Sequence, residues 1–211
     1  CCLVCGGPLA KGEECLCTRC NIGLPRTGYH RIKNNLVEQL FLGKIPLERA
    51  TAYFFYQRGS DFCHIIHQLK YGGQKEIGEA MGRYMAAELL SSGFFEGGDV
   101  IVPVPLHKKK QKLRGYNQSE WIARGISAIT SIPVETSGVV REKNTETQTR
   151  KSLFERWENV NGIFHLVTPE FFVGKHILII DDVLTTGATT VACASAFEKA
   201  QNRFLPLLKV S

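Results

Sequence analysis

From residue 51 onward, hydrophobic positions alternate between short apolar runs and stretches with helical spacing. The strand-sized runs lie at residues 51–56, 99–105, 133–140, 175–180 and 204–210. Between them, apolar residues recur with the period of a helix at residues 62–69, 77–89, 118–129 and 187–200. Because predicted strands and helices alternate along the chain, the pattern predicts an α/β protein whose mostly parallel sheet has helices on both faces.

The first twenty residues have a different character, since they hold six of the eight cysteines. They contain two Cys-x2-Cys pairs, Cys2 with Cys5 and Cys17 with Cys20. This spacing lets four thiolates converge on one structural Zn²⁺. Disulfides are the alternative, but the rest of the chain has no cysteine framework, which favours zinc and a reducing compartment. Cys1 could replace Cys2, and Cys15 could replace Cys17, with less regular spacing.

These patterns divide the chain into three parts. Residues 1–24 are expected to form a small zinc-ribbon-like module, residues 25–50 a connector, and residues 51–211 the main domain. Prolines and glycines interrupt the connector, so we expect it to pack loosely. No apolar stretch approaches the ~18 to 20 residues of a membrane span, and we expect a cytoplasmic protein.

Positive charge is concentrated in one short segment. The chain has a formal net charge of +6, and five cations fall within residues 108–114: Lys108, Lys109, Lys110, Lys112 and Arg114. An anionic partner and a solvated surface loop explain such a run equally well. We expect a basic loop whose position in the fold decides between the two.

The strongest chemical signal follows the apolar run at residues 177–180. This run predicts a buried strand that delivers Asp181 and Asp182 to the carboxyl edge of the sheet, where ligands of open α/β sheets bind. The turn at residues 185–189 then enters a helix, and its N–H groups and hydroxyls suit a phosphate. Paired carboxylates suit a vicinal diol and a hydrated Mg²⁺. A plain N-capped helix is the alternative, but one capping residue would suffice for it.

Residues 177–189 resemble the phosphoribosyl diphosphate (PRPP) signature of type I phosphoribosyltransferases at each position. The resemblance implies the type I fold, a central mostly parallel sheet flanked by helices, and makes residues 51–211 a phosphoribosyltransferase domain. It implies that the acidic pair contacts the ribose hydroxyls and that the turn binds the 5′-phosphate. The implied set for both groups is Asp181, Asp182, Val183, Leu184, Thr185, Thr186, Gly187, Ala188 and Thr189.

A second resemblance covers nearly the whole chain. The run at residues 102–106, the basic segment, residues 114–118 and the cysteine module resemble the ComF family of competence-associated, phosphoribosyltransferase-like proteins. Residues 102–106 correspond to the pyrophosphate loop of type I enzymes, and residues 141–161 to their flexible catalytic loop. Pyrophosphate is then expected at Val104, Pro105, Leu106, Arg114, Asn117 and Gln118, although the last two could instead bond the end of the following helix. Arg141 and Lys143 are expected to join Asp181 and Asp182 as catalytic residues, with ordinary surface charge as their alternative.

Residues 70–73 (Lys-Tyr-Gly-Gly) suit either a phosphate-binding turn or the C-cap of a helix that ends in a lysine. We favour the cap.

Two functions fit these features, both linked to DNA uptake or nucleotide salvage through the family resemblance. The first is an enzyme in which Mg²⁺ and cations assist the displacement of pyrophosphate from PRPP by an acceptor that the sequence does not identify. The second is a non-catalytic sensor of PRPP or a nucleotide. In that case the basic segment, Lys108, Lys109, Lys110, Lys112 and Arg114, would engage single-stranded DNA, or the protein would bind a competence helicase.

Overall fold

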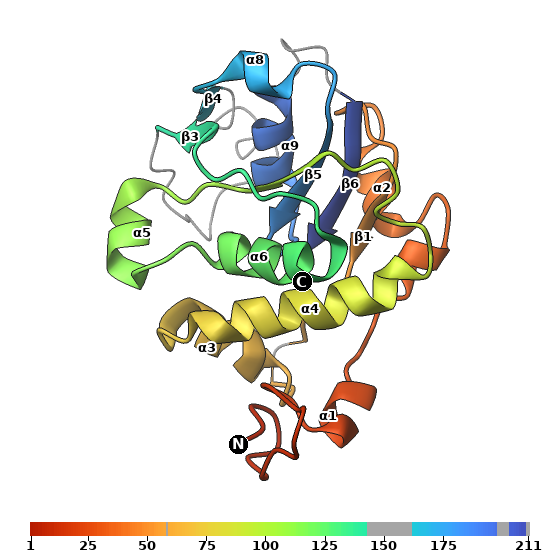
Figure 1. Ribbon diagram of the computed structural model, residues 1–211, viewed down its shortest axis with the longest axis vertical. Helices are drawn as coiled ribbons and strands as arrows, with labels where there is room; N and C mark the ends of the chain where they lie inside the picture. Colours follow the sequence, from red (N-terminus) through yellow and green to blue (C-terminus); the bar gives the residue numbers. More distant parts are fainter. Residues whose placement is uncertain (58, 143–161, 198–202, 210–211) are drawn as a thin grey trace.

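The computed structural model of this chain describes residues 1–57, 59–142, 162–197 and 203–209. Its centre is a parallel sheet with the strand order β1-β6-β5-β2 (Figure 1). The strands are β1 (Ala50–Ala52), β2 (Val100–Pro103), β5 (His176–Asp181) and β6 (Arg203–Lys209). The apolar runs at 99–105, 175–180 and 204–210 are therefore confirmed as strands, and the run at 51–56 contributes a shorter one.

The expected helices are also present, as α3 (Cys63–Tyr71), α4 (Lys75–Leu90), α6 (Gln118–Thr130) and α9 (Ala188–Ser195). Helices α4 and α6 lie side by side on one face of the sheet (Figure 1). Glycines make this close approach possible: a Cβ on Gly82 would lie 2.2 Å from the carbonyl oxygen of Ile122, and one on Gly125 would lie 2.0 Å from that of Glu79. No larger residue fits at either position without moving a helix.

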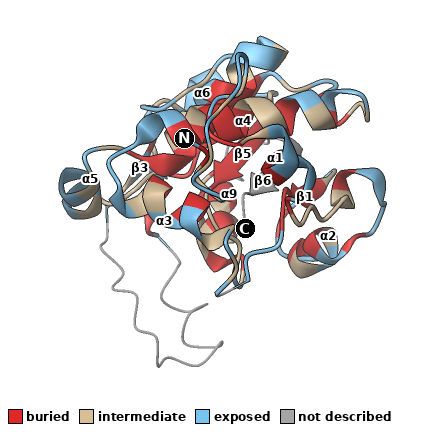
Figure 2. Ribbon diagram, turned by 90° about the horizontal axis from the view of Figure 1, so that it is seen from below, coloured by how far each residue is buried: buried red, intermediate tan, exposed pale blue. Residues whose placement is uncertain are grey.

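Alternate residues of β2 and β5 face opposite sides of the sheet, as strands buried on both faces require. Ile101, Leu178 and Ile180 pack into the core under α3, α4 and α6. Their neighbours Val102 and Ile179 pack into the opposite core, with α9. Buried positions accordingly gather on the sheet and on the inner sides of these helices (Figure 2). The fold is thus an α/β architecture with helices covering a mostly parallel sheet.

The run at residues 133–140 is not one strand, as the hydrophobic pattern predicted. Val134 makes only a single parallel bridge to Ile101. Further on, β3 (Val139–Arg141) pairs antiparallel with β4 (Phe164–Leu166) in a separate two-stranded sheet. Between the two, the Glu135 carboxylate accepts hydrogen bonds from the backbone N–H groups of Ser137 and Gly138, at 2.7 and 2.9 Å. This turn breaks the strand and redirects the chain.

The expectation of a basic loop at residues 108–114 is also wrong, because the segment is the helix α5 (Lys108–Arg114). His107 caps it, since its Nδ1 accepts a hydrogen bond of 3.2 Å from the N–H of Lys109. Gly115, at φ 82°, ends the helix with its N–H bonded to the carbonyl of Gln111. Lysine, arginine, leucine and glutamine are good helix formers, and cations in the last turn favour the helix dipole.

The connector does not pack loosely. It contains α2 (Leu36–Phe41), whose Val37 and Phe41 are buried in the core on the α9 side of the sheet. The buried Asn35 caps α2 through its Oδ1 and donates a hydrogen bond of 2.8 Å from Nδ2 to the carbonyl of Ala50 in β1. The connector is therefore tied to the edge strand of the sheet.

Three further short helices occur in the described residues: α1 (Thr18–Ile22), the 3-10 helix η1 (Tyr29–Arg31) and α8 (Pro169–Phe172). None of the described helices combines the length and the hydrophobicity needed to cross a membrane.

Candidate functional site

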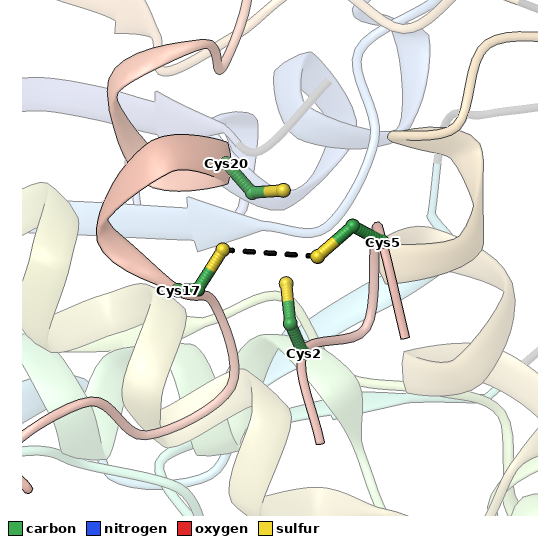
Figure 3. Close-up of side chains that lie close together, drawn as sticks. All are labelled: Cys2, Cys5, Cys17 and Cys20. Carbon is green, nitrogen blue, oxygen red and sulfur yellow. Dashed lines mark hydrogen bonds between the residues drawn. The ribbon is translucent and has the colours of Figure 1, made fainter. Parts of the chain in front are cut away.

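Four cysteine sulfurs meet at one point of the N-terminal module (Figure 3). The Sγ atoms of Cys2, Cys5, Cys17 and Cys20 all lie within 4.8 Å of one another, and those of Cys5 and Cys17 are 3.8 Å apart. Sulfurs placed ~2.3 Å from a tetrahedral zinc ion are themselves about 3.8 Å apart. A disulfide would need about 2.0 Å. The cluster therefore has the geometry of a site that can hold a metal ion.

Local backbone geometry brings the two pairs together. After Cys2 the chain folds back in a tight knuckle, in which the N–H of Cys2 bonds the carbonyl of Gly7 at 2.8 Å and that of Gly6 bonds the carbonyl of Cys2 at 2.9 Å. Gly6 takes φ 69°, which a residue with a Cβ adopts only at a cost. Helix α1 starts directly after Cys17, so Cys20 follows one turn later on the same side.

Neither of the two alternative ligands, Cys1 and Cys15, belongs to the cluster. Cys1 is exposed. Cys15 is buried, and burial raises the pKa of its thiol to about 12, which disfavours the thiolate that a metal requires.

Two thiols of the cluster have pKa values shifted in opposite directions. Although burial raises the pKa of Cys2, hydrogen bonds from the backbone N–H groups of Cys5, Cys17 and Val4 bring it down to about 6. Burial and the neighbouring sulfurs raise the pKa of Cys20 to about 12. A bound cation would remove this conflict by neutralising the converging thiolates.

The acidic pair stands at the carboxyl end of β5, as expected. Asp181 is the last residue of the strand and is buried. Its Oδ2 accepts a hydrogen bond of 3.2 Å from Oγ1 of Thr190 in α9, and its Oδ1 accepts one of 3.0 Å from the N–H of Asp182. Asp182 is half-buried, and its Oδ2 lies 3.1 Å from Nζ of Lys70 in α3. The two carboxylates are therefore held by different elements of the fold.

The turn that follows leads directly into α9. Gly187, with φ 74°, precedes the first residue of this helix, and Oγ1 of Thr186 accepts a hydrogen bond of 3.4 Å from the N–H of Ala188. Thr185 is exposed, and Thr186 and Thr189 are partly exposed. Hydroxyl groups and the start of a helix thus occur together, which is an arrangement that accepts a phosphate.

Cations from three other segments gather around the acidic pair. Burial lowers the pKa of Arg141 in β3, and the nearby Asp181 carboxylate opposes that shift. Burial also lowers the pKa of Lys110 in α5, with further lowering by Arg141 and Arg114, while Asp182 acts in the opposite direction. With Lys70, three cations lie near the two carboxylates, and Arg114 lies near Lys110, so the site has a surplus of positive charge suited to a polyanion.

The expected catalytic residue Arg141 thus lies within electrostatic reach of Asp181. Lys143, the other expected cation of this segment, falls outside the described residues.

The residues expected around pyrophosphate line the neighbouring strand end. The N–H of Val104, just after β2, bonds the carbonyl of Ile180 at 2.8 Å, so this loop adjoins β5. Asn117 caps α6 through its Oδ1 and donates a 3.0 Å hydrogen bond to the carbonyl of Val104. Oε1 of the buried Gln118 accepts a bond of 2.9 Å from Arg114. The amides of Asn117 and Gln118 therefore organise the loop and the start of α6, while Pro105 and Leu106 are partly exposed beside them.

Lys70 lies in the segment for which the sequence favoured a helix C-cap over a phosphate-binding turn. The favoured C-cap is confirmed, because the N–H of Gly72 bonds the carbonyl of Gln68 at 2.9 Å. The sequence pattern of a C-cap, however, does not indicate that the side chain of Lys70, in the same turn, contacts Asp182. More than a hundred residues separate the two partners, and no local pattern connects them.

The parallel sheet, its flanking helices and the acidic pair before the turn into α9 together have the architecture of a phosphoribosyltransferase-like protein. A comparison with models of protein families gives no match. The chain is 30% identical over 208 residues to DNA utilization protein YhgH of Escherichia coli K12, covering 92% of this chain and 88% of that protein. It is 37% identical over 92 residues to Competence protein F of Haemophilus influenzae, covering 43% and 40% of the two chains. The chain belongs to the ComF/YhgH family.

Among solved structures, the chain is similar to the glutamine PRPP amidotransferase of B. subtilis complexed with ADP and GMP. The identity is 19% and the TM-score 0.41, over 64% of this chain and 28% of that protein. This likeness is too distant to contribute to the assignment, which rests on the relatives in sequence and on the site.

Proposed function

We propose that this protein binds PRPP together with Mg²⁺ and catalyses the displacement of pyrophosphate by an acceptor still to be identified. The observation that carries the proposal is the placement of Asp181 and Asp182 at the carboxyl end of β5, directly before a turn into α9 and near three cations. A ribose with phosphate groups at both ends matches both the carboxylates and the surplus of positive charge.

Each part of the site has a distinct task in this proposal. The acidic pair accepts hydrogen bonds from the ribose 2′ and 3′ hydroxyls, and residues 183–189 hold the 5′-phosphate. Arg141, Lys143 and Arg114 stabilise the pyrophosphate as its bond to the anomeric carbon breaks. Mg²⁺ would neutralise part of the charge on the diphosphate. The chemistry requires no nucleophilic side chain, because the acceptor itself attacks the sugar.

The cysteine cluster has a structural role in the same proposal. Cys2, Cys5, Cys17 and Cys20 bind one zinc ion within a module of residues 1–24, which residues 25–50 join to a phosphoribosyltransferase domain of residues 51–211. The module contacts α4, since Glu14 pairs with Arg83 and its N–H bonds the hydroxyl of Tyr84 at 3.2 Å. The metal would therefore stabilise a part of the fold that lies against the main core.

A binding experiment tests the central claim. We expect the purified protein to bind PRPP by isothermal titration calorimetry, more tightly with Mg²⁺ than without it. Replacing Asp181 and Asp182 together by asparagine should abolish this binding, while Glu170→Gln, which removes an exposed carboxylate elsewhere, should leave it unchanged. Equal PRPP affinity in all three proteins would refute the proposed site.

Catalysis needs a separate measurement. Release of pyrophosphate from PRPP is followed with a panel of nucleobases and amines as acceptors, in the wild type and in the double asparagine variant. Turnover that the double variant lacks supports the enzyme. PRPP binding without turnover across the panel favours a PRPP or nucleotide sensor instead.

A second candidate function, binding of single-stranded DNA, is favoured by the surface beside this site. Lys108, Lys109 and Lys112 of α5 are exposed. Tyr71 is 68% exposed, and the guanidinium carbon of Arg114, at the end of the same helix, lies 5.6 Å from the centroid of the Tyr71 ring. Phosphate-binding cations beside an exposed aromatic ring are the elements of sequence-tolerant single-strand binding. The names of the relatives, DNA utilization protein and competence protein, agree with this role in DNA uptake. A competence helicase is an alternative partner for the same surface.

A further inference from the structure

The last turn of α3 places a lysine inside the candidate PRPP site. Nζ of Lys70 lies 3.1 Å from Oδ2 of Asp182, and the two side chains are 20% and 17% exposed. Because both side chains keep part of their surface exposed, the ion pair is only partly shielded from water and a ligand can reach it. The ion pair between Lys70 and Asp182 links helix α3 to the acidic pair at the end of β5.

Neighbouring elements fix the position of this turn. Leu69, directly before the lysine, is fully buried, and its carbonyl accepts a hydrogen bond of 2.6 Å from the hydroxyl of Tyr116. Tyr116 belongs to the segment between α5 and α6, directly after Arg114 and Gly115. The backbone of this turn is therefore fixed by packing, and the ion pair with Asp182 holds the Lys70 ammonium at the site.

The chemistry of the ammonium allows a second partner. A lysine ammonium has three N–H donors, and a single bond to the Asp182 carboxylate leaves others to be used. Other cations lie nearby: burial lowers the pKa of Lys110, and the charges of Arg141, Arg114 and Lys70 lower it further. Cations crowded in this way repel one another, and a polyanion between them relieves the repulsion.

The constitution of PRPP indicates which phosphate the lysine meets. If Asp181 and Asp182 accept hydrogen bonds from the 2′ and 3′ hydroxyls, the anomeric carbon lies close to the acidic pair, one bond beyond the carbon that bears the 2′ hydroxyl. The diphosphate is attached to that anomeric carbon and lies on the same face of the ring as the two hydroxyls. The 5′-phosphate lies at the other end of the sugar, over the turn at residues 185–189.

We propose that Lys70 is a diphosphate-binding residue whose ammonium bridges the Asp182 carboxylate and the diphosphate of PRPP. The inference deepens the proposed function and rests on it, because it assigns a further residue to the same ligand. It adds α3 to the elements that hold the leaving group, beside the loop after β2 and the helix α5.

Two ligands separate this role from a merely structural one. Affinities of Lys70→Met, Lys70→Arg and the wild type are measured by calorimetry, with Mg²⁺, for PRPP and for ribose 5-phosphate, which lacks the diphosphate. We expect Lys70→Met to weaken PRPP binding about tenfold or more, as loss of a charge-assisted hydrogen bond does, and ribose 5-phosphate binding less than about twofold. Lys70→Arg should restore part of the PRPP affinity. Lys75→Met, which removes an exposed lysine at the start of α4, is the matched control.

Two results overturn the inference. An equal loss for both ligands means that Lys70 only holds Asp182 in place, and no loss for either means that it has no part in binding. If Lys70→Met does not fold, Lys70→Gln provides the same comparison. Failure of the proposed function looks different, because the wild type would then not bind PRPP at all.

Discussion

Gly187, in the turn before α9, lies directly against the aromatic ring of Phe41 in α2. A Cβ on Gly187 would stand 2.7 Å from Cε1 of this ring, closer than real side chains approach. Phe41 is fully buried, so its ring has little room to move aside. The connector thus forms the support on which the candidate phosphate-binding turn rests.

Gly187→Ala should therefore destabilise the protein for two separate reasons. An alanine at φ 74° costs about 1–2 kcal/mol in backbone strain, and overlap with Phe41 adds about 1–3 kcal/mol. Gly174→Ala isolates the first effect, because Gly174 has φ 72° and a Cβ there would meet no described atom within 4 Å. The free energies of unfolding of both variants are measured in urea. A destabilisation of Gly187→Ala no greater than that of Gly174→Ala would show that Phe41 does not constrain the turn.

Residues 177–189 and helix α2, which packs against them, differ in how well the sequence predicts them. The hydrophobic run, acidic pair and hydroxylated turn at residues 177–189 are a local pattern, and the predicted strand, turn and helix are present. The packing of α2 was missed because glycines and prolines interrupt the connector on both sides of this short helix, and local composition does not indicate which distant surface covers a side chain. Phe41 and Gly187 are brought together by the fold alone.

The four-cysteine cluster leads to a prediction about metal content. We expect about one zinc ion for each chain in the wild type by elemental mass spectrometry, and strongly reduced zinc in Cys5→Ser and Cys17→Ser. Cys1→Ser is the control, because Cys1 lies outside the cluster. Zinc near zero in the wild type, or its loss in Cys1→Ser, would contradict the assignment. Chelation of the metal should also lower the melting temperature, since ligand convergence and folding are coupled.

His30 of the connector provides a prediction about pH. Burial lowers its pKa, Arg31 and Arg49 lower it further, and Glu88 opposes them. Its Nε2 accepts a hydrogen bond of 3.1 Å from Arg31, which requires the neutral ring. The folded pKa thus lies below the unfolded value of about 6.5, so as the pH falls through that value the unfolded state takes up more protons and stability is lost.

We expect the free energy of unfolding to fall between pH 7 and pH 5, with His30 contributing at most about 1.4 kcal/mol per pH unit. His30→Gln, which does not titrate, should give a flatter curve over that range, whatever its effect on stability at pH 7. Denaturant unfolding at several pH values measures both curves. Parallel curves for the two proteins would argue against a neutral, buried His30.

The basic segment shows a second limit of reasoning from sequence. Its five cations in seven residues predicted an anionic partner or a solvated loop, without distinguishing one lysine from another. As a helix, the segment turns its residues to different sides, and Lys110 is partly buried near Asp182 whereas Lys108, Lys109 and Lys112 are exposed. The helical period distinguishes these lysines only once the segment is known to be a helix. The pattern of charges along the sequence did not predict a helix.

This separation predicts that α5 serves two ligands with different lysines. Replacing the exposed Lys108, Lys109 and Lys112 together by glutamine should weaken single-stranded DNA binding. The slope of log affinity against log salt should become shallower by up to about 0.7 for each DNA phosphate that the variant no longer neutralises. The PRPP affinity of this triple variant should stay within about twofold of the wild type.

Lys110→Gln should have the opposite effect and weaken PRPP binding. The slope of log DNA affinity against log salt should then change by at most about 0.7, the contribution of one neutralised phosphate. Fluorescence anisotropy with a labelled oligonucleotide and calorimetry with PRPP measure the two effects. An unchanged salt slope in the triple variant would remove α5 from the DNA interface. Weaker PRPP binding in the triple variant would show that the two faces of the helix do not act independently.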